Sequence, residues 1–331
     1  MRKRLVAITA CLAFLLYGCG KEMEPAADAS ENSLIVVGFS QVGAESEWRV
    51  ANTESIKAAL SESNGYELIF DDARNEPENQ IRAIRNFIQQ KVDYIVFSPI
   101  VETGWDSILQ EAKDAGIPVI VIDRYIEIED SSLFTAYIGS DFLLEGENAV
   151  VWLENFLLIQ GRTEEPIRIV DIQGTMGSSA QIGRTTALEE GISRNANWVM
   201  IEQICGDFTR AKAYEVMVEI LKETQDISVV YCENDGMALG AIDALEEAGL
   251  ICNPIDGVIV ISFDATNLGL SRCLEGRIAL NVECNPLQGP YVDEIIKKLE
   301  SGESFLREQY IEEKLFDFLT VSIELIESRK Y

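Results

Sequence analysis

The 331-residue sequence contains no histidine. This absence removes the commonest general base of enzymes, the Ser-His-Asp and Cys-His arrangements, and most zinc sites. The glycine-rich loops GxGxxG and GxxxxGK[ST], which cradle phosphates, are also missing. Basic residues are scarce, because 27 Lys and Arg stand against 56 Asp and Glu and leave a net charge of −29. Such an acidic surface repels nucleic-acid phosphates, so we expect no nucleic-acid partner.

Cysteines are few and none forms a CxxC pair, which argues against a clustered metal site. Cys11 and Cys19 lie near the N-terminus. The other cysteines are Cys205, Cys232, Cys252, Cys273 and Cys284. An odd number of cysteines predicts at least one free thiol and leaves their pairing open. We therefore expect neither a metal nor a cofactor.

The N-terminus has the pattern of an export signal. Residues 1–4 are basic, and residues 5–16 form an apolar run that is too short to span a bilayer. The sequence Leu16-Tyr17-Gly18-Cys19 resembles a bacterial lipobox, in which the cysteine becomes lipidated. We predict a signal peptide at 1–18 and a lipidated tether at 19–32, which would anchor an exported chain to a membrane in the periplasm or at the cell surface. The alternative is a plain signal peptide or a short anchor.

From residue 33 onward, apolar runs alternate with segments of helical spacing. The strands expected in the first half lie at 34–39, 66–70, 94–97, 119–122 and 136–138. Those of the second half lie at 167–172, 198–204, 229–231, 258–263 and 278–282. This alternation predicts an α/β fold with two doubly wound parallel-sheet lobes. Ligands of such sheets bind at the carboxyl ends of the strands.

Polar and aromatic side chains follow most of these strands. They include Trp48-Arg49, Asp123-Arg124, Asn234-Asp235 and Asp264. Carboxylates, amides and guanidinium groups can bind vicinal hydroxyls with paired hydrogen bonds, and an aromatic face can stack on a sugar ring. For Asp207 and Asp235 the alternative is capping of the next helix.

Several of these stretches together resemble a known family. Asp123-Arg124, residues 174–178 with Arg184, residues 233–240 and residues 262–264 are similar to the periplasmic sugar-binding proteins of the ribose/galactose type. The resemblance runs from about residue 34 to the end of the chain. Residues 38–43 with Trp48-Arg49, residues 77–80 and residues 99–105 most resemble the galactofuranose-binding branch.

The resemblance implies a type I periplasmic binding protein fold with three hinge crossings, near Gly139, Cys284 and Gln309. The N-terminal lobe would then comprise 33–138 plus 284–308, and the C-terminal lobe 139–283 plus 309–331. The ligand-binding residues that it implies are Gln41, Trp48, Arg49, Ser98, Asp123, Arg124, Arg184, Asn234, Asp264 and Glu283. Glu283 stands where relatives of the ribose type have Gln.

The function that follows is that of a monomeric substrate-binding lipoprotein of an ABC importer. It would bind a monosaccharide, galactofuranose-like or a related aldose, would meet the permease subunits, and would not be an enzyme. A sensor that presents the same ligand to a chemoreceptor or histidine kinase is the alternative. A transcription regulator would need an N-terminal helix-turn-helix where the signal peptide stands. A glycosidase would need Asp123 and Asp264 as its carboxylate pair.

Overall fold

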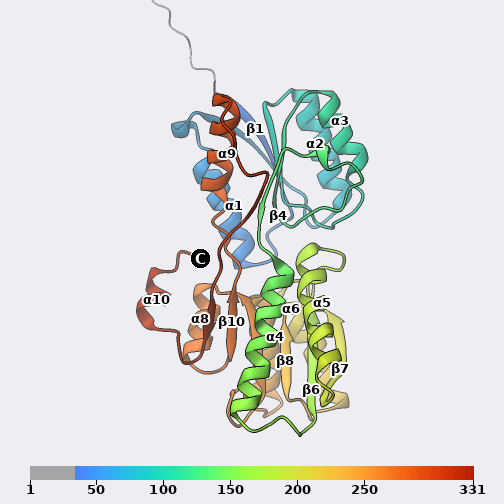
Figure 1. Ribbon diagram of the computed structural model, residues 1–331, viewed down its shortest axis with the longest axis vertical. Coiled ribbons are helices and arrows are strands. Elements are labelled where there is room, and N and C mark those ends of the chain that lie inside the picture. The colour runs from blue at the N-terminus through green and yellow to red at the C-terminus, as the bar shows by residue number, and fades with distance from the viewer. Residues whose placement is uncertain (1–33) are drawn as a thin grey trace, which may run out of the picture. The chain divides into compact units, whose positions relative to one another are not determined.

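The computed structural model describes residues 34–331 (Figure 1). The predicted signal peptide, Cys19 and the tether lie outside the described residues. Between residues 34 and 331, none of the helices combines the length and the apolar character that a membrane span requires.

The first sheet has six strands, and every neighbouring pair in it is parallel. Its order is β11-β5-β4-β3-β1-β2. The strands are β1 (Ile35–Gln41), β2 (Tyr66–Asp72), β3 (Tyr94–Phe97), β4 (Val119–Asp123), β5 (Ala136–Gly139) and β11 (Glu308–Tyr310).

Helices cover both faces of this sheet, which explains why its strands are continuous apolar runs. Successive residues of a strand point to opposite faces. In β3, Val96 packs in the cluster that contains residues of α1 (Glu47–Ala59) and α9 (Gly289–Ser301). Its neighbour Phe97 packs in the cluster that contains residues of α2 (Pro77–Gln90) and α3 (Asp106–Asp114). Two short 3-10 turns, η1 (Glu62–Asn64) and η2 (Ser131–Leu133), complete this lobe.

The second sheet also has six strands, in the order β12-β10-β9-β8-β6-β7. All of its pairs are parallel except β10 with β12, which is antiparallel. The strands are β6 (Ile167–Gln173), β7 (Trp198–Cys205), β8 (Val229–Cys232), β9 (Ile259–Asp264), β10 (Leu280–Glu283) and β12 (Leu315–Asp317).

This sheet is covered in the same way. Its buried clusters join one face to α4 and α5, and the other face to α6, α7 and α8. The helices are α4 (Phe142–Ile159), α5 (Ser179–Arg194), α6 (Arg210–Glu223), α7 (Asp235–Glu247), α8 (Asn267–Leu274) and the short α10 (Ile323–Ser328). The predicted α/β class with two doubly wound lobes is therefore confirmed.

The chain passes between the two lobes three times. The crossings follow β5, β10 and β11, and lead into α4, α9 and β12 respectively (Figure 1). The first crossing lies between Gly139 and Phe142, and the second lies between Glu283 and Gly289. The third lies at 311–314 rather than near Gln309, because Glu308–Tyr310 pairs in parallel with β5 and so belongs to the first lobe. The five cysteines between 34 and 331 are all free thiols.

Candidate functional site

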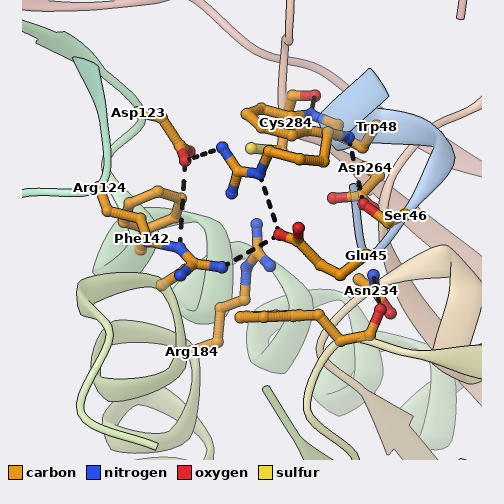
Figure 2. A pocket seen from close by; sticks show the side chains of 13 residues that line it. Glu45, Ser46, Trp48, Asp123, Arg124, Phe142, Arg184, Asn234, Asp264 and Cys284 are labelled. Atoms are coloured by element: carbon orange, nitrogen blue, oxygen red, sulfur yellow. Dashed lines mark hydrogen bonds and ion pairs between the residues drawn. The ribbon is translucent and has the colours of Figure 1, made fainter. Parts of the chain in front are cut away.

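A narrow cavity, with a volume of about 30 Å³, lies where the carboxyl ends of the two sheets meet (Figure 2). Both lobes contribute to its wall, and most of the predicted site residues line it. These are Trp48, Arg49, Asp123, Arg124, Arg184, Asn234 and Asp264.

Arg49 lies in the first turn of α1, and its side chain forms the centre of the polar wall of the first lobe. Its Nη1 donates to Asp123 Oδ2 at 2.6 Å, and its Nε donates to Glu45 Oε1 at 2.9 Å. Burial works against the charged guanidinium, but the two carboxylates outweigh it and raise the pKa of Arg49. Arg49 is therefore a fixed cation with its hydrogen-bond donors aimed at the cavity wall.

Gln41 and Ser98 lie behind this pair, because both are fully buried and neither lines the cavity. Ser98 Oγ donates to Asp123 Oδ2 at 2.8 Å and accepts from Arg49 Nη1 at 3.2 Å. Gln41 Oε1 accepts from the same Nη1 at 3.3 Å. The structure therefore places these two predicted site residues as supports that orient Arg49 and Asp123.

Of the three arginines in the site, Arg124 has the weakest ion pairing with carboxylates. Its Nη1 donates to the carbonyl oxygen of Ile100 at 3.1 Å, and its Nη2 lies 3.6 Å from Glu45 Oε1. Burial and the nearby Arg49 charge lower the pKa of Arg124 to about 10. The other carboxylate oxygen of Glu45, Oε2, is buried and has no hydrogen-bond partner among the described residues. The first lobe therefore offers a ligand two groups: the guanidinium of Arg124 as a donor and the unsatisfied Oε2 of Glu45 as an acceptor.

Arg184, on α5, is the fixed cation of the second lobe. Its Nε and Nη2 each lie 2.7 Å from Glu145 Oε2, and its Nη1 donates to the carbonyl oxygen of Glu233. Its guanidinium carbon lies 4.6 Å from the centroid of the Phe263 ring. Burial opposes the charge, but Glu145 outweighs it, and the pKa of Arg184 is raised.

Asp264 and Asn234 complete the polar wall of the second lobe. Burial first, and then the neighbouring Asp235, holds the pKa of Asp264 well above its usual range, although Arg184 opposes this. Asn234 caps α7, because its Oδ1 accepts from the backbone N–H of Met237 at 2.8 Å. Its Nδ2 donates to the carbonyl oxygen of Phe208 at 3.1 Å. Asn234 therefore lines the cavity and also begins the next helix.

Three aromatic rings supply the apolar part of the wall, from Trp48, Phe142 and Phe208. Trp48 is only 4% exposed, and its Nε1 donates to the carbonyl oxygen of Cys284 at 2.6 Å. That bond fixes the indole ring between the lobes. Fixed donors and acceptors beside aromatic faces can bind a small molecule that has hydroxyl groups on one side and C–H groups on the other.

The backbone around the cavity is held in an unusual conformation. Asp123, Asp264 and Phe208 have φ angles of 62°, 104° and 57°, and Asp207 and Ala265 next to them are also positive. Residues other than glycine seldom adopt such angles, and each costs of order 1–3 kcal/mol. Strain of this kind gathers at functional sites, which supports the assignment of this cavity as the site.

The profile of the periplasmic binding protein domain matches residues 37–291. The chain belongs to this family. The resemblance inferred from the sequence is thereby confirmed, together with the type I fold that it implies.

Relatives of this binding protein share most of its length. The galactofuranose-binding protein YtfQ of Escherichia coli is 38% identical over 272 residues, which are 81% of this chain and 83% of that one. A Mycobacterium smegmatis protein in complex with β-D-fucofuranose has a TM-score of 0.82 and 43% identity, covering 87% of this chain and 92% of that one. The periplasmic binding protein of the arabinose ABC transporter from Shewanella, bound to α- and β-L-arabinofuranose, has a TM-score of 0.80 and 37% identity, covering 89% and 95%.

Glu283 is the predicted site residue that this binding protein places elsewhere. Its carboxylate accepts from Arg329, from Tyr331 Oη at 3.1 Å and from the backbone N–H of Lys314 at 3.1 Å. It lines a separate surface pocket with the C-terminal segment. Because side chains alternate along a strand, the next residue, Cys284, is the one that reaches the cavity.

Sequence reasoning missed Glu45, Phe142 and Phe208 in this binding protein. Glu45 has a signal in the sequence, because it lies four residues before Arg49, at the spacing of an ion pair near the start of a helix. Phe208 lies three residues after the end of β7, but nothing in the sequence distinguishes it from a core residue. Phe142 begins α4, so its place in the wall depends on where the first crossing ends.

Proposed function

We propose that this chain is the substrate-binding component of an ABC importer and that it binds a monosaccharide in its furanose form. The cavity supports the proposal, because fixed charges from both lobes and three aromatic rings line the same space. A ligand can favour a closed arrangement of two lobes only through contacts that it makes with both of them. Asp123 and Arg124 on one lobe, and Arg184 on the other, provide such contacts.

The unsatisfied oxygen of Glu45 is the single observation that carries the proposal. A buried carboxylate oxygen without a partner costs about 1–3 kcal/mol or more. A sugar hydroxyl would donate to it, while the hydroxyl's lone pairs would accept from Arg124. Charged hydrogen bonds of this kind contribute about 1.5–3 kcal/mol each, so a few of them are enough for micromolar affinity.

The proposal that the bound sugar is a furanose rests on the relatives. The three proteins named above are described with galactofuranose, fucofuranose and arabinofuranose, which share a five-membered ring and differ in their substituents. The proposal of an importer rather than a sensor rests on the arabinose ABC transporter component among them.

Titration with sugars labelled with ¹³C at the anomeric carbon tests this proposal. We expect D-galactose, D-fucose or L-arabinose to give a bound anomeric signal at the furanose position, although the pyranose form dominates in free solution. The sugar should be released unchanged on denaturation, because the proposed function is binding without chemistry. A bound pyranose signal would refute the ring form, and failure of all three sugars to bind would refute the proposed function.

We also propose that the chain is exported and anchored through a lipid on Cys19. Cys19→Ser is expected to abolish labelling with radioactive palmitate and to move the protein from the membrane fraction to the soluble fraction. The reason is that acyl chains, rather than a spanning helix, would provide the membrane affinity. Cys11→Ser is the matched control, because it removes a cysteine from the same segment and should change neither result. Palmitate labelling of Cys19→Ser equal to the unaltered chain would contradict the lipobox interpretation.

A further inference from the structure

One carboxylate holds the three lobe crossings together. Glu313 lies on the third crossing, and its Oε1 accepts from Ser140 Oγ at 2.7 Å and from the backbone N–H of Asn285 at 2.7 Å. Ser140 lies on the first crossing, and Asn285 lies on the second. Glu313 is therefore bonded to both of the other segments that join the lobes.

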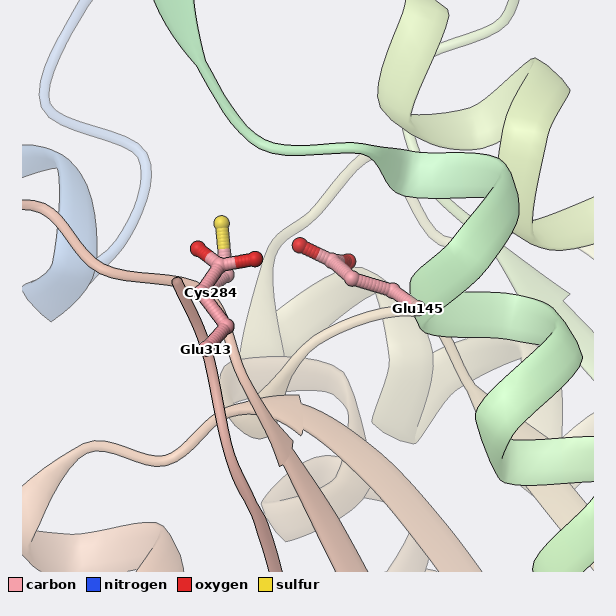
Figure 3. Close-up of side chains that lie close together, drawn as sticks. All are labelled: Glu145, Cys284 and Glu313. Carbon is pink, nitrogen blue, oxygen red and sulfur yellow. The ribbon is translucent and has the colours of Figure 1, made fainter. Parts of the chain in front are cut away.

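A second carboxylate faces this one from α4. Glu145 is 3% exposed, and its Oε2 is bonded to Arg184 in the wall of the cavity. Its other oxygen, Oε1, is buried and has no hydrogen-bond partner among the described residues. Ligand atoms of Glu145, Glu313 and Cys284 all lie within 4.8 Å of one another, and Figure 3 shows the two carboxyl groups pointing toward each other.

The charges around this pair do not balance if both acids are ionised. Among residues 34–331, the single cation that bears on the pair is Arg184 from α5, and it is already bonded to Glu145. The other described titratable groups that face the cluster are the Cys284 thiol, the hydroxyls of Tyr137 and Tyr231, and Asp264 on β9, and none of these brings a positive charge. If Glu313 were ionised as well, this partly buried carboxylate would have no cation to compensate its charge.

We propose that Glu313 is a neutral carboxylic acid whose proton is shared with Glu145 Oε1, and that it acts as a positioning residue. In this state Glu313 links the three crossings by hydrogen bonds and also donates one to Glu145. Glu145 in turn orients Arg184 in the cavity. The shared proton gives the unpartnered oxygen of Glu145 its missing donor. It also leaves Glu313 Oε1 free to accept from Ser140 and Asn285. The positioning role rests on the proposed function, whereas the shared proton does not.

The contribution of Glu313 to the free energy of unfolding should fall as the pH rises. Burial, and then the charge of Glu145, raises the pKa of Glu313 to about 10, against the hydrogen bonds from Ser140 and Asn285. Because the folded chain keeps a proton that the unfolded chain has lost above its ordinary pKa of about 4.3, folding takes up one proton between these values. The stability that Glu313 contributes is therefore complete below the unfolded pKa and is lost as the pH rises through this window.

Glu313→Gln tests the proposal, because an amide can donate to Glu145 and accept from Ser140 without a titratable proton. We expect its affinity for the tightest-binding of the three sugars to stay within about threefold of the unaltered chain. We expect Glu313→Ala to weaken binding at least tenfold.

Between pH 6 and 9, the ratio of the unfolding constants of the unaltered chain and Glu313→Gln should rise about tenfold per pH unit. Glu312→Gln is the control, because it makes the same change at an exposed neighbour.

An infrared difference spectrum can detect the protonated carboxyl group of Glu313 directly. At pH 7.5 the unaltered chain minus Glu313→Gln should show the carbonyl stretch of a protonated carboxylic acid, shifted in ²H₂O. If this band is missing, or the unfolding ratio does not change with pH, the shared proton is refuted. The shared proton is also refuted if Co²⁺ binds with a thiolate absorption that Cys284→Ser removes, since the cluster would then be a cation site.

If the proton is present but Glu313→Ala binds as tightly as the unaltered chain, only the positioning role is refuted. Failure of every sugar to bind would count against the proposed function and would leave the spectrum intact.

Discussion

Replacement of Arg184 by alanine is expected to weaken sugar binding by about 30- to 1000-fold, or about 2–4 kcal/mol. The variant loses the charged hydrogen bonds of the second lobe to the ligand. It also leaves the buried carboxylate of Glu145 without its cation. Isothermal titration with the tightest-binding of the three sugars measures the loss. Small-angle scattering at matched concentration should show less compaction on addition of that sugar.

Arg194→Ala is the matched control for this variant. Arg194 lies on the same helix, α5, but is 49% exposed and reaches only the surface carboxylates of Glu154 and Glu190. Its removal should leave the affinity unchanged. If Arg184→Ala is folded and binds as tightly as the unaltered chain, then the second lobe does not hold the ligand through this side chain. Adding Glu145→Gln to Arg184→Ala should restore stability without restoring affinity.

Replacement of Asp235 by alanine should lower the free energy of unfolding by about 3–5 kcal/mol. Asp235 begins α7, and its carboxylate accepts four hydrogen bonds, from Ser262 Oγ, from Asn281 Nδ2, and from both the N–H and the Oγ1 of Thr266. These bonds join α7 to β9, β10 and the start of α8. Alanine would leave all of these donors buried without an acceptor. Urea unfolding followed by circular dichroism measures the loss.

The size of this effect depends on burial, so an exposed aspartate of the same helix serves as the control. Asp243 is 44% exposed and pairs with Arg210 at the surface, so Asp243→Ala should cost no more than about 1 kcal/mol. Asp235 also packs closely, since a Cβ at Gly269 would lie 2.1 Å from its Oδ2. Equal losses for the two variants would show that the hydrogen bonds of Asp235 do not stabilise the second lobe.

The sequence predicts the lobes well because buried parallel strands are local apolar runs. Asp123, Asp264 and Asn234 could be found in the same way, since each stands where its strand ends. Glu283 shows the limit of this reasoning, because the face that a residue takes depends on the register of β10 with its neighbours. A slip of one residue exchanges Glu283 for Cys284.

Residues that act through distant partners were harder to predict. Glu145 stands in the first turn of its helix, where an acidic residue is ordinary, and only the fold brings it to Arg184, 39 residues away. The role of Gln41 and Ser98 as supports likewise depends on side-chain contacts with Arg49. The third crossing was placed too early because a three-residue edge strand carries almost no periodic signal.

The three crossings also determine the order in which the chain can fold. The core of the first lobe includes Val292 and Ile295 of α9, and β5 stays at the edge of its sheet until β11 pairs with it. During synthesis, most of the second lobe is therefore complete before the last pieces of the first one exist. An N-terminal fragment that stops at Gly139 would expose the apolar face that α9 covers. A truncation that removes α9 and β11 therefore damages the lobe that begins the chain as directly as a change in its own strands.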